Sequence, residues 1–349
     1  MTKLIWDIGT AYDFFISLYV LYHPEDYGLR RAWAAGVRSR LPAVERDALG
    51  DLLDIMFAPL SWIYELPTPK DSAALLSQLA QLPAAERLPR LALGPHLPPS
   101  AKSLLLDVAA RGAWTEEDHQ QLRDFFQQRE DSAPKKKMLT RMLDLWSQPE
   151  RVGEQILHGM KAYHTVFFAE EEGRIKSVLQ EAVGRAQEMA QRLPLSDLLD
   201  ELAQGVSFSH APETAELVLI PSFWVTPLVA LVPYSESQML YLFGARPANV
   251  SLIPGEVVPD MLYKALKALA DPTRLRILRY LTTDQMTPAD LARRLRLRPP
   301  TVTHHLQALR IAGLIRLTID DNGRLYTPRM EAIAGAYQAL EAFLQSDEE

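Results

Sequence analysis

The chain has 349 residues, of which 48% are hydrophobic and 23% are charged, and its formal net charge is −7. This length exceeds that of one domain of about 100–200 residues, and the ordinary globular composition excludes a disordered chain. There is no cysteine, which excludes disulfides, thiolate metal sites and cysteine nucleophiles.

The N-terminal segment indicates neither a secretion signal nor a membrane span. Met1-Thr2-Lys3 is followed at once by Trp6 and Asp7, and the longest early apolar run, 11–22, contains Asp13. A span of a bilayer needs about 20 apolar residues, so this run predicts a buried helix. We expect a cytoplasmic protein with no membrane partner, and the lack of cysteine agrees with a reducing compartment.

Residues 1–213 are predicted to be mainly helical. Apolar residues recur at helical spacing in five segments: 49–57, 72–82, 101–110, 138–147 and 152–168. Thr115 followed by three acidic residues predicts a further helix start, because a hydroxyl caps the first turn and acids favour the positive end of the dipole.

The first 64 residues hold eleven of the 29 aromatic side chains of the chain. An apolar pocket with polar Tyr and Trp tips would suit a small-molecule effector. A plain aromatic core or an oligomer interface is the simpler interpretation, and we favour it.

Residues 216–253 differ from the helical part. They are rich in Val, Leu, Ile and aromatic residues, in short pieces broken by Pro221, Pro227, Pro233 and Gly244, which predicts two to four short strands in a small sheet. The prolines of 254–259 predict a linker. The expected fold class is therefore mainly α (α+β), with a helical body at 1–257 followed by a second domain at 258–345.

The second domain shows a specific order of elements. Two helices are predicted, one on each side of Asp271-Pro272. The apolar face of the first is formed by Leu262, Leu266 and Leu269, and that of the second by Leu275, Leu278 and Leu281. A third helix begins at Thr287-Pro288, with Asp290 at the capping-box position.

A fourth helix follows Pro299-Pro300, and its apolar stripe is Val302, Leu306 and Leu309, with Gly313 as its terminator. Alternating residues around Asn322-Gly323 predict a β-hairpin. A last helix, 330–344, offers a further apolar stripe formed by Ile333, Tyr337, Leu340 and Leu344.

This order and the charge indicate a DNA-binding winged helix-turn-helix. Residues 258–345 carry 13 basic against 8 acidic residues, a net charge of +5, while the remainder carries −12. The second helix of a helix-turn-helix enters the major groove, and the hairpin contacts flanking phosphates. The candidate DNA contacts lie off the apolar stripe and on the wing: Arg298, Thr301, Thr303, His304, Gln307, Arg310, Arg316, Asn322 and Arg324.

The segments LADPTRLRILRYL and LARRLRLRPPTVTHHLQALRIAGLI, followed by the Asn-Gly hairpin, resemble the ArsR family of winged-helix repressors. The resemblance covers about a quarter of the chain. It implies a homodimer formed through the first and last helices of the module, and two recognition helices on an inverted-repeat operator with half-sites about 10 bp apart.

The sequence departs from the metal-sensing members of that family. Thr287–Leu291 stands where those members have a cysteine pair, and the last helix has no histidine. We therefore expect neither of the two known kinds of metal-sensing site. Adjacent His304 and His305 point about 100° apart on a helix, so they are poorly placed to chelate a metal. The family pattern assigns His305 to packing and His304 to the outward, DNA-facing position.

No motif for catalysis or phosphate binding is present, so no catalytic residue, metal or cofactor is expected. The expected function is a cytoplasmic transcription regulator, a repressor by family resemblance, whose affinity for double-stranded DNA is tuned by the body, either through a small ligand or through dimer geometry. The alternatives are an enzyme with a winged helix for targeting, or a module that binds a protein partner.

Overall fold

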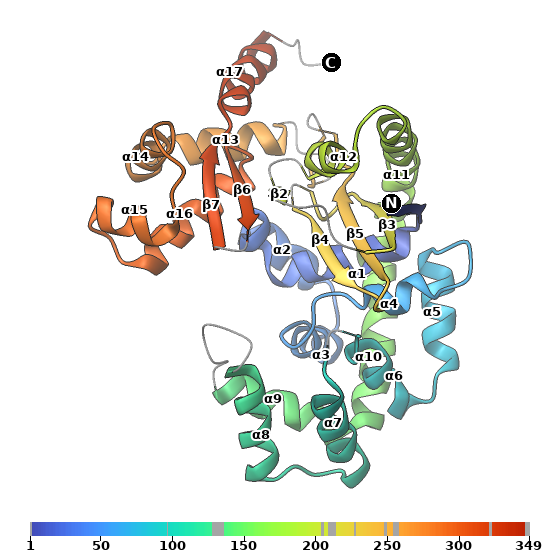
Figure 1. Cartoon of the computed structure of the whole chain (residues 1–349). Coiled ribbons are helices and arrows are strands. Elements are labelled where there is room, and N and C mark those ends of the chain that lie inside the picture. The colour runs from blue at the N-terminus through green and yellow to red at the C-terminus, as the bar shows by residue number, and fades with distance from the viewer. Residues whose placement is uncertain are drawn as a thin grey trace.

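The structure, a computed structural model, describes residues 2–95, 97–127, 136–203, 206–208, 214–226, 228–247, 250–253, 258–320 and 323–345. The chain is mainly helical and carries two small sheets, as its sequence predicts (Figure 1). In the body, the elements up to the first long connection are β1 Lys3–Trp6, α1 Thr10–Tyr22, the 3₁₀ turn η1 Pro24–Tyr27, α2 Arg31–Arg38, α3 Ala43–Leu53, α4 Leu60–Tyr64, α5 Ser72–Gln81, α6 Ala84–Ala92, α7 Pro99–Arg111 and α8 Glu116–Gln127.

The rest of the body comprises α9 Lys136–Trp146, α10 Pro149–Tyr163, the π-helical turn η2 His164–Phe168, α11 Ala169–Ala190, α12 Leu195–Leu202, β2 Val206–Phe208, β3 Glu216–Ser222, β4 Ala230–Pro233 and β5 Gln238–Gly244. The C-terminal module comprises α13 Asp260–Leu269, α14 Pro272–Leu281, α15 Pro288–Leu295, α16 Pro299–Ile311, β6 Ile315–Asp320, β7 Gly323–Pro328 and α17 Met330–Gln345.

The sheet of the body has the strand order β1-β3-β5-β4. Strands β1, β3 and β5 are parallel, and β4 is antiparallel to β5. Leu217–Ser222 of β3 are all buried, as expected of a central parallel strand that is covered on both faces. The sheet predicted for 216–253 is therefore confirmed, but it also includes β1, whose four residues lie in the part predicted as mainly helical.

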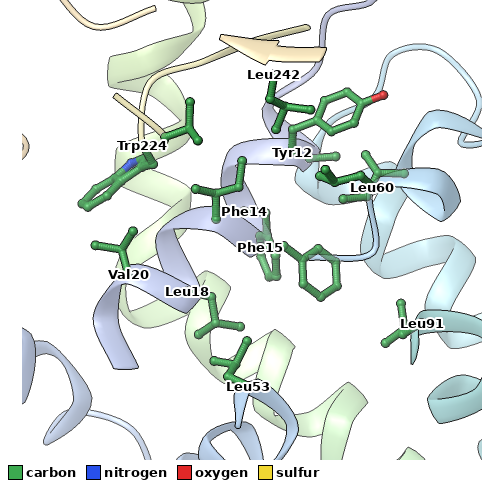
Figure 2. Close-up of a cluster of buried hydrophobic side chains, with 14 of the residues drawn as sticks. Tyr12, Phe14, Phe15, Leu18, Val20, Leu53, Leu60, Leu91, Trp224 and Leu242 are labelled. Carbon is green, nitrogen blue, oxygen red and sulfur yellow. The ribbon is translucent and has the colours of Figure 1, made fainter. Parts of the chain in front are cut away.

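Helix α1 runs through a cluster of buried hydrophobic side chains (Figure 2). Tyr12, Phe14 and Phe15 are fully buried, and the Phe14 ring meets Tyr163 and Phe168 edge-on at centroid distances of 5.2 and 4.9 Å. An edge-on arrangement at these distances is favourable for aromatic pairs. The N-terminal aromatic residues thus form a packed core, as the simpler interpretation of the sequence holds.

One continuous helical rod, α10-η2-α11, connects the two ends of the body. Helix α10 packs on α3, α5 and α6, while α11 packs on β3 and α12. The π turn at His164–Phe168 falls where Tyr163 and Phe168 enter the aromatic core. No helix among the described residues is long and apolar enough to cross a membrane.

Buried apolar side chains form two clusters, one from Ala11 to Leu252 and the other from Ala265 to Ala336. The predicted boundary at 257 and most of the predicted linker lie outside the described residues, so the boundary stays a prediction. A strand nevertheless connects the two parts, because β2 of the body pairs in parallel with β6, giving a second sheet of order β2-β6-β7.

Candidate nucleic-acid interface

Helix α15 begins with the capping box that the sequence predicts. The Thr287 hydroxyl accepts a hydrogen bond from the Asp290 N–H at 3.2 Å, and the Asp290 carboxylate accepts one from the Thr287 N–H at 3.2 Å. The helix ends at Arg296, which has a left-handed φ of 57°, and the Leu297 N–H donates to the Ala292 carbonyl at 3.0 Å. These contacts fix both ends of the helix that precedes α16.

The first two turns of α16 present an exposed polar surface. Val302, Leu306 and Leu309 form the buried stripe, as predicted. Arg298 at the N-cap is exposed, and so are Thr301, Thr303 and His304. The Thr303 hydroxyl donates to the Pro299 carbonyl at 3.1 Å, so its proton is used within the helix while its oxygen can still accept. A helix N-terminus attracts anions, and arginine, hydroxyl and imidazole groups can bond to phosphates or base edges.

The C-terminal half of α16 is partly covered by the body. The Gln307 amide nitrogen lies 3.5 Å from the Asp26 carboxylate of η1. Arg310 is half-buried, and burial is the largest of the effects that lower the pKa of its guanidinium, which also lies near Tyr326 and Tyr27. Two of the predicted DNA contacts therefore face the protein itself in this structure.

The β6-β7 hairpin is the predicted wing, with Ile315 paired to Pro328 at its base. Arg324 is exposed on β7, whereas Arg316 is half-buried on β6. The predicted contact Asn322 lies outside the described residues. The outer edge of β6 does not face solvent over Leu317–Ile319, because β2 is paired to it there.

The arginines of α14 and α15 differ in their exposure to solvent and in their pairing. Arg276 and Arg279 are exposed, and Arg293 is ion-paired with Asp290. Arg274 is partly buried, and it donates to the Lys267 carbonyl at 3.0 Å. The stripe of α14 needs correction, since Leu275 is 48% exposed while Ile277 is fully buried.

His305 lies on the inner side of α16. Its Nδ1 is 3.9 Å from the Asp271 carboxylate, and burial is the largest of the effects that lower the pKa of its imidazole, partly opposed by that carboxylate. This position agrees with the packing role that the family pattern implies. Within the described ranges, no group of three or more His, Asp or Glu side chains could hold a metal ion.

A cluster of buried polar groups in the body is the other arrangement of residues that could act on a substrate. Asp13 accepts hydrogen bonds from the Ser222 hydroxyl at 2.6 Å and from the N–H groups of Phe223 and Trp224 at 3.1 and 2.9 Å. Burial raises the pKa of Asp13 to about 6, although these hydrogen bonds oppose the rise. Asp13 and Ser222 are both fully buried, so their contacts brace the end of β3 against α1 and offer no surface to a substrate.

Two features of the interface escape sequence reasoning. The pairing of β2 with β6 and the approach of η1 to α16 both join segments that lie more than 100 residues apart. The sequence offers one weak signal for the second, the glycine at 28. Its φ is +70°, and a Cβ there would lie only 2.9 Å from Ile311 at the end of α16.

Comparison with known proteins agrees with this geometry. Residues 269–318 match the family of helix-turn-helix domains, and this match runs from the end of α13 through α14, α15 and α16 into β6. The comparison with curated proteins gave no match. The C-terminal part of the chain is thus a helix-turn-helix module, and such a module indicates DNA binding.

Proposed function

We propose that this protein is a homodimeric transcription regulator of the ArsR kind, which binds an inverted-repeat operator through α16 and its wing. The observation that carries the proposal is the exposed surface of Arg298, Thr301 and His304 at the N-terminus of α16, within a module that matches helix-turn-helix domains. Arg324 would contact flanking phosphate. The resemblance to the ArsR repressors favours repression over activation.

An apolar seam on α17 supports the dimer. Met330, Tyr337 and Leu344 are 56%, 61% and 73% exposed and recur every seven residues, with the partly exposed Leu340 between the last two. A repeat of this kind is the seam of a two-helix contact. A second copy of the chain would cover it and place two α16 helices on successive major grooves, with half-sites about 10 bp apart.

We propose binding rather than catalysis as the activity. The carboxylate of Asp13 is enclosed and accepts hydrogen bonds from Ser222 at the end of β3 and from the backbone that follows it. A small-molecule effector remains part of the hypothesis, but the aromatic side chains that suggested a pocket are used in the core. An open hollow of about 520 Å³ beside α2 and α3 is lined mainly by arginine and aspartate, so an effector bound there would be polar.

The test is the salt dependence of binding to duplexes taken from DNA upstream of the protein's own gene, measured by fluorescence anisotropy. Each phosphate contact lowers the logarithm of the association constant by about 0.9 per unit of log salt, so several contacts per protomer give a steep slope. The proposal fails if no duplex binds even at low salt.

Analytical ultracentrifugation tests the dimer separately. Tyr337→Glu and Leu344→Glu place a charge on the α17 seam and should shift the protein to monomers and weaken operator binding at least tenfold. Gln338→Glu, on an exposed position beside the seam, is the matched control and should leave the dimer intact. A wild-type protein that is monomeric at micromolar concentration would contradict this part of the proposal.

A further inference from the structure

The 3₁₀ turn η1 and the residues after it lie against the module. Gly28 packs against the side chains of Ile311 on α16 and Lys264 on α13, so closely that any side chain at 28 would collide with them. Tyr27, only 4% exposed, lies beside Arg310. The backbone of the body therefore lies between the recognition helix and the first helix of the module.

Acidic groups of η1 face the polar side of α16. The Asp26 carboxylate accepts from Gln307, and Glu25 and Asp26 are both exposed next to the helix. The pKa of Glu25 is lowered mainly by its hydrogen bond from Arg31, with smaller contributions from His304 and Lys267 of the module. Asp26 thus lies beside Gln307 and Glu25 lies near His304, so both negative side chains are on the polar side of α16.

Further contacts hold the body in this position. The Arg30 guanidinium lies 5.3 Å above the ring of Tyr263 on α13, a cation–π distance. Buried Asp260, at the start of α13, is 3.6 Å from Arg246 of the body, and it accepts from the Leu252 N–H at 3.1 Å. Together with the β2-β6 pairing, these contacts attach the body to α13 and to the wing strand β6.

We propose that η1 and Gly28 form an autoinhibitory cover, in which Glu25 and Asp26 take the place of DNA phosphates on the polar side of α16. This inference rests on the proposed function, since it assumes that α16 binds DNA. Like charges exclude each other at close range, so operator DNA and the acidic turn cannot occupy this face together. The body must swing away for Gln307 and Arg310 to reach DNA. The apparent dissociation constant is then the intrinsic constant divided by the fraction of open molecules.

The first test weakens the cover from the side of the body, with the full chain. Asp26→Arg replaces the bond to Gln307 by repulsion from Arg310, and it should tighten binding to an upstream duplex about tenfold. Glu188→Arg, on an exposed position of α11, changes the net charge equally and is the matched control, expected to change affinity by less than about threefold.

The second test locks the cover. Because the chain has no cysteine, Arg30→Cys combined with Tyr263→Cys gives a single pair for a short bis-maleimide cross-link. The cross-linked protein should bind the same duplex at least tenfold more weakly than the same variant before cross-linking. Mass spectrometry of the tryptic peptides confirms that the link is intramolecular.

The outcomes separate the two proposals. If Asp26→Arg binds no tighter than Glu188→Arg, and the cross-link leaves affinity unchanged while the duplex is still bound, the cover is wrong and the DNA-binding function stands. If neither the wild type, Asp26→Arg nor the unlinked pair binds any duplex at low salt, the proposed function itself fails, and the cover fails with it.

Discussion

Polar side chains serve different purposes in the body and in the module. Several charged groups of the body are buried and hydrogen-bonded within it: the Lys70 ammonium donates to Asp7 at 2.5 Å and to the Tyr64 carbonyl at 2.6 Å, and Arg87 donates to the carbonyls of Leu79 and Gly153. In the module most arginines and the polar residues of the first turns of α16 are exposed. Groups already satisfied within the protein cannot exchange water for a ligand, whereas exposed ones can. Binding is therefore expected of the module, and stability of the body is expected from its polar network.

The variant with the largest expected effect removes the carboxylate of Asp13. Asp13→Ala leaves the Ser222 hydroxyl and the N–H groups of Phe223 and Trp224 without their acceptor, at about 1–3 kcal/mol for each unsatisfied buried group. We expect the free energy of unfolding of the body to fall by about 3–5 kcal/mol. All six tryptophans lie in the body, so urea titration followed by tryptophan fluorescence measures it directly. Thr301→Ala, in the module, should leave that curve unchanged; a shift of similar size would contradict the division of roles.

The next test concerns the exposed half of α16. His304→Ala should weaken binding to a specific duplex by about 1–3 kcal/mol and leave binding to random duplex almost unchanged, because base contacts carry specificity. Arg324→Ala is the matched comparison on the wing. Loss of a phosphate contact should weaken binding to both duplexes equally and should reduce the slope of log affinity against log salt by about one. Equal losses on both duplexes for His304→Ala would remove it from base recognition. Urea midpoints for both variants should equal that of the wild type, since both side chains are exposed.

The module could be predicted almost element by element from the sequence. Its signals are local: Thr287 and Asp290 cap a helix, Pro299 begins the next, and Val302, Leu306 and Leu309 recur at helical spacing. Each of these depends on residues within one or two turns. The error at Leu275 has the same origin, because periodicity alone does not say which of two apolar residues two positions apart, Leu275 or Ile277, faces the core.

The body could be predicted only as a class. Strand β1 has four residues and pairs with β3, which lies more than 200 positions further along the chain, so no local sequence pattern predicts it. The same limit applies to the site, where the exposed residues of α16 were predictable from its stripe but their partial cover by Asp26 and Tyr27 was not. Contacts between segments distant in sequence depend on the packing of the whole fold.

The smallest effect is a pH dependence that belongs to the body alone. Burial raises the pKa of Asp13 in the folded protein to about 6, against 3.8 for an ordinary aspartate. The folded state therefore binds this proton more tightly than the unfolded state, and the resulting stabilisation is complete below the unfolded pKa and is lost as the pH rises through about 6.

Between pH 7 and pH 5 this contribution should stabilise the folded body by about 1 kcal/mol, since one pKa unit corresponds to about 1.4 kcal/mol. The measurement is the difference in unfolding free energy between the wild type and Asp13→Asn across this range, because other carboxyl groups cancel in the difference. The unfolding free energy of the wild type should rise relative to that of the variant as the pH falls. A flat difference would mean that Asp13 is not enclosed as the structure has it. Binding of DNA by the module should not follow this profile, because Asp13 does not lie at the recognition helix.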